Sequence, residues 1–70
     1  MEMTPVDSTN LSAIGYDYES ATLRVDFLKG RSYVYYGVPA ELYEGLLSAG
    51  SKGQYLNIHI KKGGFIYSPV

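Results

Sequence analysis

Residues 22–27 read Thr-Leu-Arg-Val-Asp-Phe, and this stretch decides the fold of the chain. Apolar side chains at Leu23, Val25 and Phe27 alternate with polar side chains at the positions between them. A period of two predicts a β-strand with one buried face and one face in water. We therefore expect an antiparallel sheet that is covered on one side only.

Two further strands are predicted on either side of this one. Residues 12–18 alternate in the same way, and residues 32–38 form a nearly continuous apolar run. Lys29 and Gly30 predict a hairpin between the second and third strands, because glycine accepts the positive φ that tight turns need.

The register of this hairpin decides which tyrosines can join the core. A loop of three residues puts Tyr33 and Tyr35 on the same face as Leu23, whereas a loop of two residues puts Val34 and Tyr36 there. We favour the first register.

Residues 39–49 predict a helix. Pro39 suits the first helical turn, where a missing N–H has no cost, and Gly50 is a typical residue to end it. The predicted buried stripe has leucine and tyrosine side chains at i, i+4 spacing, namely Leu42, Tyr43, Leu46 and Leu47.

A second helix is predicted from the following serine to Lys62. Ser51 and Gln54 have the spacing of a capping box, in which each side chain bonds the backbone amide of the other residue. Residues 65–67 can then return as a strand at the sheet edge, and Pro69 is expected to end its pairing.

Together these elements predict an α+β domain with the element order β-β-β-α-α-β. The sheet is expected to be a small antiparallel β-meander of three strands, to which the C-terminal segment can add a fourth edge strand, with two short helices packed on one side. Residues 1–10 are polar and lack periodicity, so we expect a flexible N-terminal tail in which only Val6 contacts the domain. Residues 11–70 are expected to form the single domain.

The composition limits the function classes. The chain has 70 residues and no cysteine, which excludes disulfides, thiolate zinc sites and thiol catalysis. Six Lys and Arg against seven Asp and Glu give a net charge of −1, which argues against a surface that is basic throughout. No apolar run is long enough to span a bilayer, and no signal peptide is recognisable. We therefore expect a cytoplasmic protein without a membrane anchor.

No group of residues predicts catalysis. His59 is the only histidine and has no nucleophile or carboxylate at a readable spacing. Asp17 and Glu19 are expected to be solvated carboxylates beside a turn. Residues 45–52 have the glycine spacing of a phosphate-binding loop, but Ser and Lys stand in the wrong order and the first glycine falls inside a helix. We expect no enzyme activity, metal, cofactor or small-molecule substrate.

Basic side chains interleaved with tyrosines are the remaining candidate site. A tyrosine beside an arginine on an open sheet is a platform for base stacking, and lysines on a neighbouring helix can meet phosphates. The same composition also suits a solvated surface around packed tyrosines. The candidate nucleic-acid-binding residues from this reasoning are Arg24, Arg31, Tyr36, Lys52, Lys61 and Lys62.

Five short motifs occur in a fixed order over residues 10–70. They are Ser12-x-Ile14-Gly-Tyr16-Asp17, Leu23-x-Val25-x-Phe27, Tyr33-x-Tyr35, Val38-Pro39 and Ser51-Lys-Gly-x-Tyr55-x-Asn57-x-x-Ile60-Lys61. As an ordered set they resemble the KTSC domain, whose name abbreviates lysyl-tRNA synthetase C-terminal domain. The resemblance implies a small domain that occurs alone in bacterial and phage proteins and at the end of some lysyl-tRNA synthetases. Its occurrence in these synthetases suggests RNA binding.

The resemblance also assigns residues. The Tyr-x-Tyr signature of the family falls on Tyr33 and Tyr35, and the block after the first helix adds Asn57 to the candidate contacts. Where the family often has a polar residue between the two tyrosines, this chain has Val34, which weakens the case for an RNA platform on the outer side of the sheet.

Two functions remain open from the sequence. The leading hypothesis is a non-catalytic module that binds RNA, including structured RNA such as tRNA, through Arg24, Arg31, Tyr36 and the basic side of the second helix. The alternative is a protein-interaction or homodimerising module that uses the tyrosine-rich surface or a free sheet edge.

Overall fold

Five strands and two helical segments make up the structure, a computed structural model that describes all 70 residues. The strands pair antiparallel in chain order, so β1 and β5 are the edges of the sheet. Their bounds are β1 Met3–Pro5, β2 Leu11–Asp17, β3 Thr22–Phe27, β4 Ser32–Tyr35 and β5 Tyr67–Pro69. Between β4 and β5 lie α1 Ala40–Ser48 and a second helical segment, which consists of α2 Lys52–Tyr55, a π-helical turn Leu56–Ile60 and a 3-10 turn Lys61–Gly63.

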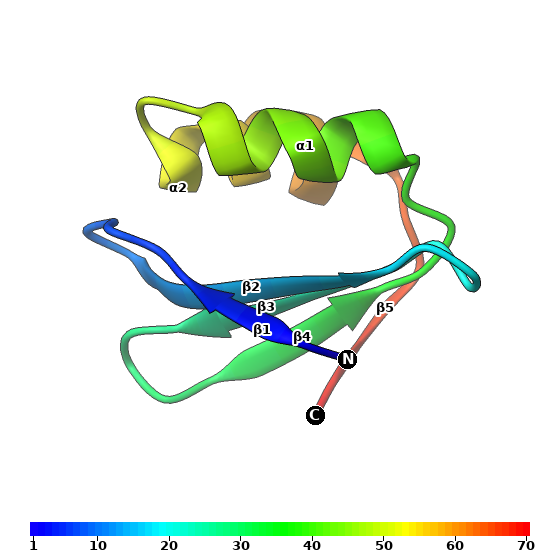
Figure 1. Ribbon diagram of the computed structural model, residues 1–70, viewed down its shortest axis with the longest axis horizontal. Coiled ribbons are helices and arrows are strands. Elements are labelled where there is room, and N and C mark those ends of the chain that lie inside the picture. The colour runs from blue at the N-terminus through cyan, green and yellow to red at the C-terminus, as the bar shows by residue number, and fades with distance from the viewer.

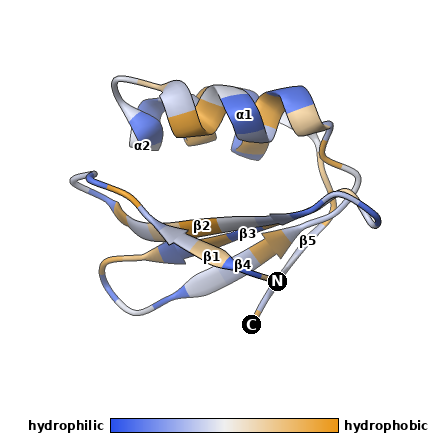
Figure 2. Cartoon of the chain, in the orientation of Figure 1, coloured by the Kyte–Doolittle hydropathy of each residue, from blue (hydrophilic) through white to orange (hydrophobic).

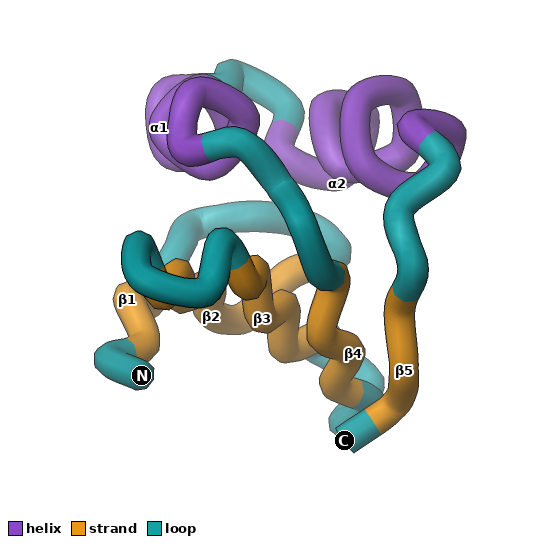
Figure 3. The backbone as a smooth tube through the Cα atoms, turned by 90° about the vertical axis from the view of Figure 1, so that its right-hand side faces the viewer, coloured by secondary structure: helices purple, strands orange, loops and turns teal.

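Both helical segments cover the same face of the sheet (Figure 1). In the rotated view α1 lies above β1 and β2, whereas the second helical segment lies toward β4 and β5 (Figure 3). Figure 2 shows apolar residues on the side of α1 that is turned to the sheet. The predicted α+β arrangement with helices on one side is thus confirmed. Below, the covered side of the sheet is called the inner face and the other side the outer face.

The sheet has five strands, so the prediction of three or four was too low. The additional strand is β1, which lies within residues 1–10, where we expected a flexible tail. Three residues are too few to show alternation, and Pro5 discouraged a strand assignment. Gly15 explains how the N-terminus packs here, because a Cβ at this position would lie 2.6 Å from the Met3 Sδ. The missing side chain lets the N-terminal residues cover the outer face.

The predicted C-terminal strand was placed two residues too early. The observed β5 pairs with β4 through Tyr67, Ser68 and Pro69 rather than through residues 65–67. The third predicted strand also ends sooner than expected, at Tyr35, because the chain turns at Gly37 with a φ of 69°.

The hairpin register is the one that we favoured. Leu23 pairs with Tyr35 and Val25 with Tyr33, so both signature tyrosines lie on the inner face. A β-bulge between Leu11 and Ala13 shifts the register of β2. The bulge lets Leu11 and Ile14 both point inward although they are three residues apart, and both are fully buried.

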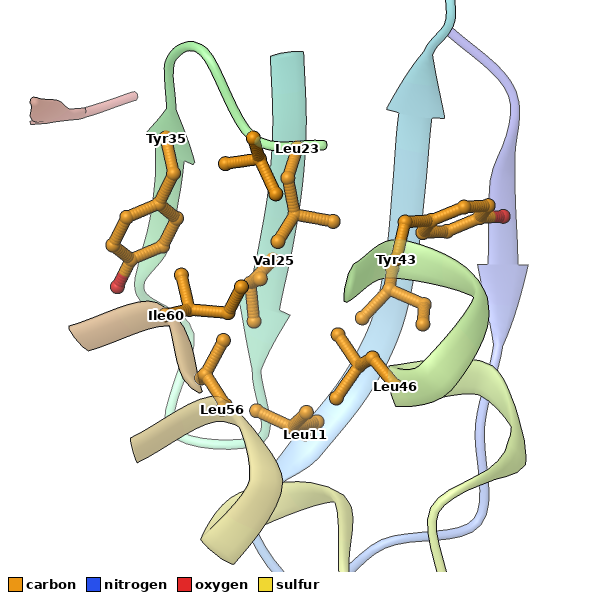
Figure 4. Packing of buried hydrophobic residues seen from close by; sticks show 10 residues of the cluster. Leu11, Leu23, Val25, Tyr35, Tyr43, Leu46, Leu56 and Ile60 are labelled. Atoms are coloured by element: carbon orange, nitrogen blue, oxygen red, sulfur yellow. The ribbon is translucent and has the colours of Figure 1, made fainter. Parts of the chain in front are cut away.

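The core lies between the sheet and the helices (Figure 4). It contains ten buried side chains from both layers, namely Leu11, Ile14, Leu23, Val25, Tyr35, Val38, Tyr43, Leu46, Leu56 and Ile60. Burial of this apolar surface is the main force that holds the helices on the sheet.

The buried stripe of α1 is narrower than predicted. Tyr43 and Leu46 are buried and Leu42 is partly buried, but Leu47 is exposed. The helix also has a close contact at Gly45, where a Cβ would lie 2.7 Å from the Cζ of Tyr55. Glycine at this position therefore lets α1 approach α2 closely.

The second helical segment is less regular than the predicted single helix. The capping box is wrong, because Ser51 makes no side-chain hydrogen bond at this terminus. Instead the Lys52 Nζ donates to the carbonyl oxygen of Ala49 at 3.0 Å, which satisfies an acceptor near the end of α1. The π-helical turn keeps Leu56 and Ile60 in the core, and Gly64 ends the segment with a φ of 80°. Neither helical segment is long and apolar enough to cross a membrane.

Candidate basic and aromatic groove

An open groove of about 730 Å³ lies between the β3–β4 turn, the residues that precede β2, and the second helical segment. Phe27 and Tyr33 provide aromatic surface, because both are inner-face residues near the sheet end where this turn lies. Three cations, Lys29, Arg31 and Lys61, line the same groove. We call this surface the basic groove.

The aromatic and cationic parts of the basic groove touch each other. The Lys61 Nζ lies 5.2 Å from the centre of the Phe27 ring, within the range of a cation–π contact. Phe27 in turn packs edge-to-face against Tyr33, with ring centres 6.0 Å apart. The cation of Lys61 is exposed, so the contact positions the amine without removing it from solvent.

Charge is unevenly distributed over the molecule. No Asp or Glu lines the basic groove. Four carboxylates lie instead near the β2–β3 turn and α1, at the other end of β3, namely Asp17, Glu19, Glu41 and Glu44. Partial burial, with help from Glu41 and Asp17, raises the pKa of Tyr16 at that end. The net charge of −1 is therefore compatible with a groove that is basic locally.

The basic groove brings together two of the predicted contact residues. Arg31 and Lys61 both line it, together with the signature residue Tyr33. Arg31 is exposed at the end of the hairpin turn, and Lys61 begins the 3-10 turn that leads back toward β5.

Arg24 and Tyr36 are not part of this groove. Arg24 pairs with Val34 and lies between two inner-face residues of β3, so its side chain is on the outer face. The Tyr36 hydroxyl lies 3.2 Å from the Oγ of Ser68, which shares that outer row. A single surface that contains Arg24, Tyr36 and the second helical segment is therefore excluded by the geometry of the sheet.

Arg24 also has a partner. Its Nε lies 3.0 Å from an oxygen of Asp26, two residues along the same strand. Burial alone would raise the pKa of Asp26, but hydrogen bonds from Arg24 and Ser32 outweigh it and hold this pKa below its usual value. Arg24 is thus held in an ion pair on the outer face.

The remaining predicted residues lie outside the basic groove. Lys52 donates to the carbonyl oxygen of Ala49, directly after α1, while Asn57 and Lys62 are exposed on the second helical segment. None of the three is among the residues that line the groove.

Three residues near the predicted contacts were not predicted as candidate site residues from the sequence. Lys29 was used only as a hairpin marker and Phe27 only as a core residue, although both line the groove. Tyr67 faces Tyr35 across the β4–β5 pair, and its ring lies 6.0 Å from that of Tyr33. The signal for Lys29 was its position two residues before Arg31 in the same turn. Tyr67 could have been predicted to lie beside Tyr35 only if β5 had been placed correctly.

The remaining titratable side chains considered above make local contacts. His59 is exposed and packs on Tyr55, with ring centres 4.3 Å apart, as expected from their spacing on the helix. No three His, Asp or Glu side chains are grouped closely enough to hold a metal ion. Asp17 accepts hydrogen bonds from the Glu19 amide and the Ser20 hydroxyl, which is the arrangement of a carboxylate that closes a turn.

Comparison with known proteins places this architecture in a family. Residues 7–65 match the model of the KTSC domain. A protein of Tsukamurella paurometabola is 41% identical over 59 residues, which cover 84% of this chain and 88% of that protein. An uncharacterised protein of Stutzerimonas stutzeri is 39% identical over 57 residues, which cover 81% of this chain and 80% of that protein.

A solved structure agrees over nearly the whole chain. The crystal structure of a KTSC domain protein from Yersinia pestis superposes with a TM-score of 0.89 at 34% sequence identity. The match covers 99% of this chain and 96% of that one, so it includes both edge strands. The chain belongs to the KTSC domain family.

Proposed function

We propose that this protein is a non-catalytic RNA-binding module and that RNA contacts it through the basic groove. One observation carries the proposal. Lys29, Arg31 and Lys61 come from two separate parts of the chain and line one groove with the partly buried rings of Phe27 and Tyr33, and no carboxylate is among the residues that line the groove.

This arrangement suits both parts of a nucleotide. Lysine and arginine side chains neutralise phosphates and supply most of the affinity of sequence-independent binding. Aromatic rings stack on bases, which adds about 1–3 kcal/mol per base in single-strand binders. The net charge of −1 does not oppose the proposal, because the four carboxylates of the acidic end are separated from the groove by the length of β3.

Equilibrium binding tests this proposal. Fluorescence anisotropy would be measured with bulk tRNA and with a mixed-sequence single-stranded RNA, at low and at physiological salt. We expect the exposed-surface variant Lys61→Glu to weaken binding at least tenfold. The matched control is Lys62→Glu, which makes the same charge change at the next position, outside the groove. Equal loss in both variants would mean a general charge effect and would refute a groove-specific site.

The alternative of a protein-interaction or homodimerising module is less well supported in its sheet-edge form. Along an antiparallel edge strand, the backbone groups of successive residues point alternately to the neighbouring strand and to the open edge. The Val6 N–H donates to the Ser12 carbonyl oxygen at 3.1 Å, so the backbone of the preceding residue, Pro5, points to the open edge of β1. Pro69 occupies the equivalent outward position on β5. A proline has no N–H to donate, so both edges are poor templates for an added strand.

A cytoplasmic location belongs to the same proposal. It is the compartment in which tRNA is available, and a chain without cysteine needs no oxidising environment in which to fold.

A further inference from the structure

A second, smaller cavity adjoins the basic groove. It has a volume of about 280 Å³ and is lined by Tyr33, Tyr35, Tyr67 and Lys61. Tyr33 and Lys61 also line the basic groove, so the two spaces share a wall. We call the smaller space the tyrosine pocket. Its volume is slightly below the usual range for ligand pockets, which is roughly 300–1,000 Å³, and so suits one ring system rather than an extended ligand.

The rings of the tyrosine pocket are not stacked on each other. Tyr67 meets Tyr33 at an interplanar angle of 68° and Tyr35 at 37°, with ring centres 6.0 and 5.8 Å apart. Their faces are therefore only partly covered by one another. Tyr67 is also 60% exposed, which leaves ring surface on the open side of β5 for a flat partner.

The hydroxyl groups of the tyrosine pocket have no partner within the chain. Intramolecular hydrogen bonds do hold three other tyrosine hydroxyls, those of Tyr16, Tyr18 and Tyr36. Tyr35 as a whole is only 4% exposed. However, every side-chain nitrogen or oxygen atom that is fully buried in this protein has a hydrogen-bond partner, and the Tyr35 hydroxyl has none. The hydroxyl of Tyr35 is therefore still accessible, and so is that of half-buried Tyr33.

The chemistry of the lining selects the class of ligand. Ring faces favour a planar partner, free phenolic hydroxyls favour one with hydrogen-bonding edges, and the adjacent cations favour an attached anion. A nucleobase with its phosphate has all three properties. The basic groove would hold the phosphate at Lys29, Arg31 or Lys61, and the base would enter the neighbouring tyrosine pocket.

We infer that the tyrosine pocket receives a single unpaired nucleobase, so that the module recognises single-stranded or looped RNA rather than continuous duplex. This inference rests on the proposed function. A base in a duplex is stacked on both sides and cannot present its face, whereas an unpaired base can be turned out of the strand and stacked on an aromatic side chain.

The test compares one RNA strand with its own blunt duplex by fluorescence anisotropy. The variant is Tyr67→Ala, and the matched control is Tyr18→Ala, because Tyr18 has a similar exposure of 62% but lies at the acidic end. We expect the single strand to bind more tightly than the duplex, and Tyr67→Ala to weaken single-strand binding about tenfold. Tyr18→Ala should bind as the unmodified protein does. Tyr67→Phe retains the ring and should retain most of the affinity.

The possible failures are distinguishable. Equal affinity for strand and duplex, with no effect of Tyr67→Ala but strong loss in Lys61→Glu, would refute the nucleobase pocket and leave RNA binding by the basic groove intact. No binding of either RNA would refute both.

Because Tyr67 is on an edge strand, amide spectra of the variants would be compared first. If Tyr67→Ala loses the fold, the ring-proton shifts of the unmodified protein decide instead. Upfield shifts of the Tyr67 and Tyr33 rings on strand addition support the pocket, and unchanged ring signals in an RNA-bound protein refute it.

Discussion

The amine of Lys61 lies 5.2 Å from the centre of the Phe27 ring, and this contact joins the second helical segment to the end of β3. Lys61 is also the cation shared by the basic groove and the tyrosine pocket. RNA binding should therefore depend more on Lys61 than on any other side chain.

The first prediction concerns the salt dependence of binding. Lys61→Ala should weaken RNA affinity at all salt concentrations and reduce the slope of log affinity against log salt by about one, because one phosphate contact is lost. Lys62→Ala should leave the slope unchanged. Affinities measured at four or more salt concentrations give the slopes, and an identical reduction in both variants would contradict a specific contact at Lys61.

The second prediction concerns stability and pH. The folded-state pKa of Asp26 is lowered, so its contribution to stability is present above the unfolded-chain pKa of about 3.9 and is lost as the pH falls through the folded value. Asp26→Asn should therefore lower the free energy of unfolding at pH 7 by about 0.2–1 kcal/mol and make less difference near pH 3. Urea denaturation at both pH values measures this. Arg24→Gln should have a similar pH dependence because it removes the ion-pair partner, and a deficit in Asp26→Asn that does not shrink in acid would argue against the ion pair.

The third prediction concerns the sheet edges. The unmodified protein is expected to sediment as a monomer, because a proline faces outward on each edge strand. The double variant Pro5→Thr and Pro69→Thr restores an outward N–H on both edges and should produce dimers or larger species. Pro39→Ala is the control, since Pro39 precedes α1 and lies on neither edge. Sedimentation velocity at high concentration measures the outcome, and a double variant that remains monomeric would mean that something else protects the edges.

The fourth prediction concerns the contact between the helical segments. Gly45→Ala gains up to about 1 kcal/mol of helix propensity but places a methyl group against the Tyr55 ring. Overpacking of this kind costs about 1–3 kcal/mol, so we expect a net loss of about 1 kcal/mol in thermal or urea unfolding. Gly50→Ala meets no atom within 4 Å and should not lower stability in the same way. A Gly45→Ala protein of greater stability would show that Tyr55 moves aside freely.

Local patterns predicted the centre of the fold correctly. Alternation in residues 22–27 and the length of the following loop together determine the inner face, and this places Tyr33 and Tyr35 beside Leu23 and Val25. The edges were predicted poorly because their pairing depends on neighbours rather than on pattern. Neither β1 nor β5 exceeds three residues, and each contains a proline whose outward orientation is visible only in the assembled sheet.

The candidate site was predicted in part, and one error could have been avoided. Since Leu23 and Val25 lie under the helices, Arg24 between them must point to the outer face, so Arg24 and Lys61 cannot share a surface. This conclusion follows from the same alternation of apolar and polar residues that predicted the strand. The grouping of Arg31 with Lys61 and Phe27 could not be derived in this way, because it depends on how the irregular second helical segment passes over the end of β3.

RNA binding by the basic groove can be tested directly by an amide chemical-shift titration with bulk tRNA and with a mixed single-stranded RNA, at low and at physiological salt. We expect localised shifts at Lys29, Arg31, Tyr33 and Lys61 that persist at physiological salt, with little change at Arg24 and Tyr36 on the outer face. Shifts centred on the outer face, or diffuse shifts that disappear as salt is added, would contradict RNA binding by the basic groove.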